Sequence, residues 1–284
     1  MFDKLQSSWT LAKASWSVLQ SDKELLIFPI ISFIGSVIVS ILFAVPFFTV
    51  GIVEGSRGND PGLTPLGIII GFLFYVVLYT VIFFCNTALI GAALIRLKGG
   101  DPTVSDGFRI ASERLTHIVG YAIISATVGM ILRAVSERGG LIGQIVSGLV
   151  GFAWNVATFL VVPVLVIENI GPWDAIKRSS ALLKKTWGEN LIGNAGIGLV
   201  TFLVMIAGLF ITIGLAIFGA NINSTPFVIA VIIVGVIFMI LLGLISSALT
   251  GIYQAAVYRF AAEGETGGMF APELVHQAFK PKRG

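Results

Sequence analysis

The sequence predicts an all-α membrane protein with six transmembrane helices, in one polytopic domain that covers residues 1–284. Three observations predict this class: the composition, the long runs without charge, and the one-sided distribution of Lys and Arg. The chain is 56% hydrophobic and only 12% charged, with a mean hydropathy of +0.96, whereas about a quarter of the residues of a soluble domain are charged. Between Glu189 and Arg259, 69 consecutive residues include no Asp, Glu, Lys, Arg or His. A bilayer selects for such a run, because each ionised side chain at its centre costs roughly 2.5–3.5 kcal/mol.

Apolar runs of 18 or more residues are typical of membrane helices. The chain contains six of them, at about 25–50, 66–95, 115–133, 141–167, 190–219 and 227–258. The third run is the weakest, since His117 and Arg133 bound it. Proline lacks a backbone N–H, so Pro46 and Pro163 are expected to kink or end the first and fourth helices.

Basic residues predict the orientation of these spans. The segments that share a side with the N-terminus hold 15 Lys and Arg residues, and the opposite side holds three, Arg57, Arg133 and Arg138. Because Lys and Arg accumulate in cytoplasmic loops, both termini are predicted to be cytoplasmic, including a tail over 259–284. The first apolar run is long and lacks an Ala-x-Ala end, so no cleaved signal peptide is expected. The simplest location is the plasma (inner) membrane of a prokaryote.

One basic cassette occurs twice. Residues 8–16 (SWTLAKASW) and 179–187 (SSALLKKTW) share the pattern Ser-x-x-Leu-x-Lys-x-(Ser/Thr)-Trp. In each copy the helical period places Trp and Leu on one face and Lys on the other. Residues 104–118 repeat the apolar spacing. All three segments lie on the predicted cytoplasmic side and precede spans one, three and five, which predicts amphipathic helices in the plane of the membrane, the first over 1–23.

Such helices place Trp rings at headgroup depth and ammonium groups against anionic lipid. The residues predicted to contact the lipid surface are Trp9, Lys13, Trp16, Trp173, Lys177, Arg178, Lys184, Lys185 and Trp187. The repeated pattern also suggests a structural unit of one surface helix and one transmembrane hairpin. This unit would occur three times, over roughly 1–100, 101–170 and 171–284. Two other interpretations stay open: that Trp and Lys are common wherever a loop enters a membrane helix, and that these helices recognise a partner.

Small residues recur every four positions within several spans, as in Gly243, Ser247 and Gly251 of the sixth and Gly67 and Gly71 of the second. Such stripes let membrane helices approach closely, and the alternative is a gating or dimer seam. Asn86 and Asn155 are the deepest amides and candidates for hydrogen bonds between helices or to a solute. Glu168 follows Pro163 at a helix end, where it is expected to cap the helix or to pair with Lys177 or another loop cation.

The sequence lacks the motifs of the common enzyme classes: no His-Glu-x-x-His, Gly-x-Ser-x-Gly or phosphate-binding Gly loop occurs. Its two histidines, His117 and His276, lie in different segments without Cys neighbours, so no metal site and no cofactor are expected. No acidic residue lies at mid-depth in a span, which disfavours a proton- or sodium-coupled transporter. The basic residues flank apolar spans, so membrane lipid and not nucleic acid is the expected partner.

The stretch DAIKRSSALLKKTWGENLIGNAGIGLV (174–200), preceded by VVPVLVIEN, resembles uncharacterised six-span membrane families of prokaryotes. These families are similar to the membrane domain attached to some glycerophosphodiester phosphodiesterases. The resemblance implies a fold and a membrane location. It implies no catalytic residue, because the chain has no hydrophilic stretch long enough for the phosphodiesterase domain.

Two functions follow as hypotheses. In the first, the chain is a non-enzymatic integral membrane protein whose surface helices bind anionic lipid, together with a membrane protein partner or a second copy of the chain. In the second, it is a transporter or channel for a neutral or amphiphilic solute that passes between helices. A deep polar cavity lined by Asn86 or Asn155 would favour the second, and a dry, closely packed centre the first.

Overall fold

The computed structural model describes residues 13–55, 64–187 and 196–264, and all regular structure within these residues is helical. Residues 13–21 form a helix that leads into the short helix η1. The elements that follow are η1 (Lys23–Leu26), α2 (Ile27–Gly55), α3 (Pro65–Leu97), α4 (Val104–Glu113), α5 (Leu115–Arg138), α6 (Gly140–Ala157), α7 (Val161–Glu168), α8 (Pro172–Trp187), α9 (Gly196–Asn221) and α10 (Thr225–Glu263).

Six segments are long and apolar enough to cross a membrane, which confirms the predicted number of spans. They are Lys23–Thr49, Pro65–Leu97, Leu115–Arg138, Gly140–Glu168, Thr201–Asn221 and Thr225–Glu263. The third span reaches Arg138, one turn beyond the predicted end near residue 133. The structure therefore shows an all-helical, multi-pass membrane protein.

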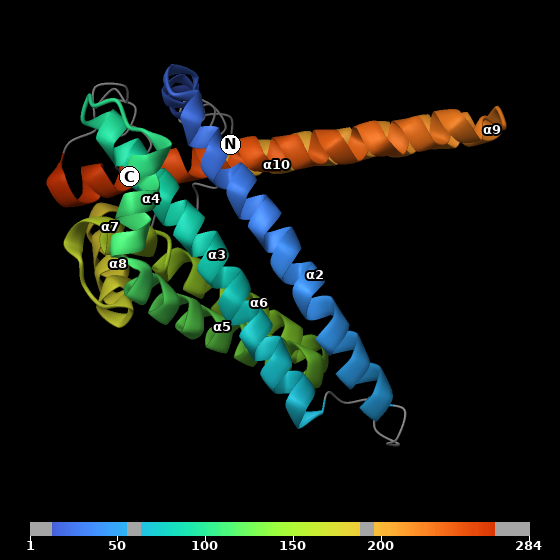
Figure 1. Ribbon diagram of the computed structural model, residues 1–284, viewed down its shortest axis with the longest axis horizontal. Coiled ribbons are helices and arrows are strands. Elements are labelled where there is room, and N and C mark those ends of the chain that lie inside the picture. Colours follow the sequence, from blue (N-terminus) through green and yellow to red (C-terminus); the bar gives the residue numbers. More distant parts are fainter. Residues whose placement is uncertain (1–12, 56–63, 188–195, 265–284) are drawn as a thin grey trace, which may run out of the picture.

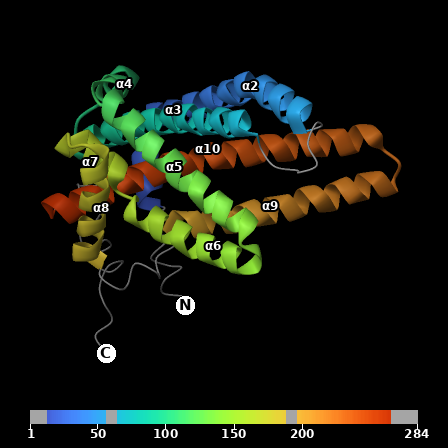
Figure 2. The ribbon, with the colours of Figure 1, turned by 90° about the horizontal axis from the view of Figure 1, so that it is seen from below.

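The spans form three helical hairpins that leave a common end of the molecule, and the α9–α10 hairpin points away from the other two (Figure 1). The pairs are α2 with α3, α5 with α6, and α9 with α10, and the partners within each pair pack against each other. Figure 2 shows the same arrangement from below, with the hairpin tips at the end opposite α7 and α8. We call the common end the base: it comprises the helix 13–21, η1, α4, α7, α8, the last three turns of α3 and the last three turns of α10.

The buried core lies at the base. Leu25, Phe28, the stretch from Ala88 to Leu94, the stretch from Leu160 to Leu165, and the last turns of α10 form one hydrophobic cluster. Beyond the base the hairpins expose apolar side chains, among them Leu42, Phe210 and Val234. Lipid tails can solvate such surfaces, so these side chains need no protein contact.

The two predicted proline effects differ in outcome. Helix α2 continues through Pro46 to Gly55, so Pro46 does not end it. The fourth span is interrupted at residues 158–160, between α6 and α7, and Pro163 lies in the first turn of α7. A first-turn N–H has no partner within a helix, so Pro163 costs α7 no hydrogen bond.

Glycines mark the closest helix contacts at the base. A Cβ on Gly107 of α4 would lie 2.5 Å from the Phe28 ring and 2.8 Å from the Ala88 carbonyl oxygen of α3. A Cβ on Gly251 of α10 would lie 2.5 Å from the Leu89 side chain. By contrast, a Cβ on Gly71 or Gly243 would meet no atom within 4 Å. The small-residue stripes therefore serve packing at some positions and leave open space at others.

Candidate functional site

Helix α8 packs its apolar face onto protein. Ala175, Ile176, Ser179, Leu182 and Leu183 are buried, and α8 contacts α5, α6, α7 and α10. The Ser179 hydroxyl accepts a hydrogen bond of 3.0 Å from the Leu160 backbone N–H at the break between α6 and α7. The buried face includes Ile176 and Leu183. Trp173 itself lies outside it and is 58% exposed.

The helix 13–21 is docked in a similar way. Ser15, Val18 and Leu19 are buried, whereas Trp16 is 41% exposed and Lys13 is exposed. On α8, Lys184 is exposed as well. Three of the predicted lipid contacts lie outside the described part of the structure: Trp9 precedes residue 13, and the side chains of Lys185 and Trp187 are not described.

A carboxylate at the end of α7 connects three elements of the base. Both oxygens of Glu168 accept hydrogen bonds from Arg178 Nε of α8, at 2.9 and 3.0 Å. The Tyr258 hydroxyl of α10 donates to Glu168 Oε1 at 3.0 Å. Lys177, the cation named for Glu168 from the sequence, instead lies 3.5 Å from Asp174 within α8. Asn169, in the left-handed conformation with φ 49°, ends α7 and accepts a hydrogen bond of 2.6 Å from Arg114.

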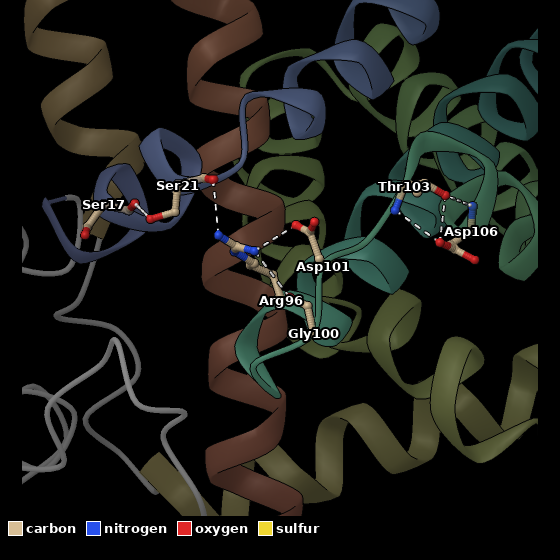
Figure 3. Close-up of polar contacts among 7 residues, drawn as sticks. All are labelled: Ser17, Ser21, Arg96, Gly100, Asp101, Thr103 and Asp106. Atoms are coloured by element: carbon tan, nitrogen blue, oxygen red, sulfur yellow. Dashed lines mark hydrogen bonds and ion pairs between the residues drawn. The ribbon is translucent and has the colours of Figure 1, made fainter.

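Arg96 ties the helix 13–21 to the end of α3 (Figure 3). Its guanidinium donates to the Ser21 carbonyl oxygen at 3.2 Å and pairs with Asp101 at 3.0 Å. Next to it, Thr103 and Asp106 form a reciprocal capping box at the start of α4. Hydrogen bonds from Thr103 and Arg109 hold the pKa of Asp106 below its ordinary value of 3.8. Specific hydrogen bonds and ion pairs therefore connect the elements of the base.

A cavity of about 440 Å³ lies between α2, α3, α9 and α10, at the point where two hairpins diverge above the base. Ser32 lies about five residues from the base end of α2 and Asn86 about 11 residues from that of α3, which places them roughly 8 and 17 Å along their helices. The polar residues of the lining are Ser32, Cys85, Asn86, Thr201, Ser246, Ser247, Thr250 and Gln254. None of the described residues that line the cavity is charged.

The lining offers hydrogen bonds to an uncharged group. The Oε1 atom of Gln254 is buried and has no hydrogen-bond partner among the described residues. Thr201 of α9 and Ser246 of α10 bond to each other across 3.0 Å. A buried amide oxygen without a partner costs about 1–3 kcal/mol, which a hydroxyl or amide of a bound molecule would offset. The arrangement suits a neutral molecule with hydroxyl or amide groups.

The structure separates the two amides that the sequence singled out. Asn86 lines the cavity, whereas Asn155 lies on an exposed face of α6 and is not part of it. Sequence reasoning missed Gln254 and Thr201. A signal existed for α10, where Gly243, Ser247, Thr250 and Gln254 follow one another at steps of three and four residues and thus share a face. Within the described residues, no group of three or more His, Cys, Asp or Glu side chains is placed to hold a metal ion.

Comparison with known proteins gives a family without an assigned activity. A family model described as a family of unknown function, DUF6159, matches residues 65–268, which include five of the six spans. No curated protein matches the chain.

Proposed function

The chain belongs to the DUF6159 family of unknown function, and we propose that it is a non-enzymatic integral membrane protein that binds and transports a neutral amphiphilic solute. The observation that carries the proposal is the uncharged polar cavity between the α2–α3 and α9–α10 hairpins. Water does not satisfy polar groups in the hydrocarbon region, so the unpaired amide oxygen of Gln254 favours a bound partner.

The chemistry of the lining defines the solute class. Amide and hydroxyl groups recognise hydroxyls, and the absence of charged groups among the described lining residues makes binding of an ionised headgroup costly. Apolar residues such as Phe28, Phe202 and Met205 complete the lining and suit an acyl chain. A glycosyl diacylglycerol has both parts.

The proposal includes an orientation. The basic residues of the helix 13–21, α4 and α8 lie at the base, whereas Arg133 and Arg138 lie at the far end of α5. By the positive-inside rule the base faces the cytoplasm, and we assign the protein to the plasma (inner) membrane of a prokaryote as the simplest location. The cavity then opens within the cytoplasmic half of the bilayer.

The experiment uses the full chain in lipid nanodiscs with a photoreactive, clickable glucosyl diacylglycerol. Labelled peptides are expected from residues 82–89 of α3 and 243–254 of α10. Gly243→Leu adds a side chain where a Cβ meets no atom within 4 Å, so it fills the cavity and lowers this labelling by about fivefold or more.

Gly214→Leu is the matched control, because Gly214 of α9 is exposed, does not line the cavity and also has open space around its Cα. Its labelling should equal that of the wild type. Equal labelling of the Gly243→Leu protein, with a thermal unfolding profile like the wild type, would refute the proposed solute site.

A second candidate function is contact with anionic lipid at the base, and the exposure of Trp16, Trp173 and Lys177 supports it. These side chains lie on elements that are already docked on the bundle, so their exposed parts are available to a membrane surface. Exchange of Lys13, Lys177, Lys184 and Lys185 for Gln should weaken photo-crosslinking to phosphatidylglycerol at the base while the protein stays in the membrane. Unchanged crosslinking would count against lipid contact at the base. It would not affect the proposal that the cavity binds a neutral solute.

A further inference from the structure

A second, larger cavity lies at the opposite end of the molecule. It has a volume of about 790 Å³ and is lined by α2, α3 and α5, within the range of roughly 300–1,000 Å³ that is common for ligand pockets. We call it the far-end cleft. It shares no lining residue with the cavity above the base.

The far-end cleft has an apolar part and a charged part. Phe43, Phe74 and Met130 line it toward the middle of the bilayer, at positions that lie several turns from the far ends of their helices. Arg133, Glu137 and Arg138 line it in the last two turns of α5. Along α5 the order from membrane middle to membrane surface is therefore apolar and then cationic, which is the order of acyl chain and headgroup in a lipid.

The charged part carries a net positive charge. Arg133 Nε bonds Glu137 Oε1 at 2.7 Å, and Arg133 also donates to the Tyr75 hydroxyl at 3.3 Å. The Glu137 carboxylate is thus neutralised within the cleft. Arg138 makes no ion pair among the described residues, so its guanidinium provides an attraction for a phosphate, to which Arg binds through two parallel N–H groups.

The apolar part is not filled by the protein itself. Gly71 lines the cleft, and a Cβ at this position would meet no atom within 4 Å. Gly67, one turn earlier on α3, also lines it. The stripe of small residues on α3, expected to bring helices into contact, here faces open space.

We propose that the far-end cleft binds an anionic phospholipid of the leaflet opposite the base, with an acyl chain along Phe43, Phe74 and Gly71 and the phosphate at Arg138. The inference does not depend on the solute that the other cavity binds.

The test uses the full chain in nanodiscs with two photoreactive, clickable probes, phosphatidylglycerol and phosphatidylcholine, followed by peptide mapping. Phosphatidylglycerol is expected to label peptides within 66–75 and 130–138, several times more strongly than phosphatidylcholine. Gly71→Leu should reduce labelling by both probes at least about fivefold, because the leucine side chain fills the part of the cleft that holds the acyl chain. Arg138→Gln should reduce phosphatidylglycerol labelling about threefold or more and leave phosphatidylcholine labelling unchanged.

Gly148→Leu is the matched control, since Gly148 of α6 is exposed, lies outside the cleft and likewise has no atom near a new Cβ. Wild-type labelling of the Gly71→Leu protein overturns the inference. Equal labelling by both probes, with no effect of Arg138→Gln, also overturns the inference. It would mean that the cleft binds acyl chains without recognising the headgroup. Crosslinks between two copies at residues 66–75 would assign the cleft to a dimer. If Gly71→Leu does not fold, the Arg138→Gln comparison decides alone.

Discussion

At the residue scale, polar side chains without a hydrogen-bond partner differ in role from those that are fully paired. Gln254 lines a cavity and has an unpaired oxygen, whereas Glu168 is engaged by Arg178 and Tyr258. A polar group without a partner lowers stability and is typical of a binding site, while a polar group with partners holds the fold.

Gln254→Leu is expected to make the protein more stable and less able to bind. Removal of a buried unpaired amide oxygen should raise the free energy of unfolding by about 1 kcal/mol. Labelling by the glucosyl diacylglycerol probe should fall at the same time. Thermal unfolding and crosslinking of the same sample measure both effects. Asn155→Leu is the control, and a Gln254→Leu protein that gains no stability and labels normally would contradict the assignment.

Glu168→Gln should lower the free energy of unfolding by about 1 kcal/mol, a value reduced for the partial exposure of both partners. The change removes the charge that Arg178 and Tyr258 bond. Lys177→Gln is the matched comparison, since Lys177 and Asp174 are both about two-thirds exposed, and it should shift stability by less than about 0.5 kcal/mol. Equal effects in chemical denaturation would mean that Glu168 does not join the three elements.

At the element scale, helix ends and close contacts decide how the base is assembled. Helix α4 begins in a capping box and lies against α3 through Gly107. Helix α8 lies on α6, α7 and α10. The helical period of these segments predicted one apolar face each, but a period does not say whether protein or lipid covers that face. For this reason the apolar face of α8 could be predicted, but the burial of Leu183 against protein and the exposure of Trp173 could not.

The capping box of α4 predicts a pH effect. Because the folded-state pKa of Asp106 is below 3.8, its carboxylate stabilises α4 above that pH, and the contribution is lost as the pH falls through the folded-state value. Asp106→Asn should therefore lower the unfolding temperature at pH 7, and the difference from the wild type should shrink at pH 3. A difference that is the same at both pH values would contradict a role for the charge.

Gly107→Ala should weaken the docking of α4. The added methyl group meets the Ala88 carbonyl oxygen at 2.8 Å, and backbone cannot move aside as a flexible side chain can. Overpacking of this kind costs about 1–3 kcal/mol. Gly148→Ala on exposed α6 is the control and should leave stability equal or slightly higher, because Ala favours helix. An unfolding midpoint of Gly107→Ala equal to that of the control would show that α4 is loosely held.

At the scale of the whole molecule, three hairpins rise from one packed base and enclose two separate cavities. The six spans could be predicted because charge is excluded from them over long runs, as between Glu189 and Arg259. The cavities could not, since each combines side chains from two different hairpins. Asn86 was a candidate because amides are rare at that depth, but Ser32 and Thr201 look like any small polar residue whose hydroxyl can bond its own helix.

The functional proposals all depend on the base and the far end lying on opposite sides of one membrane. Single cysteines at Ala181 of α8, Arg138 of α5 and Asn221 of α9, in a Cys85→Ala background, test this directly with a membrane-impermeant maleimide. Arg138→Cys and Asn221→Cys should react in intact cells, and Ala181→Cys only after the membrane is opened. Reaction of Ala181→Cys and Arg138→Cys from the same side would contradict the six-span arrangement and both lipid sites.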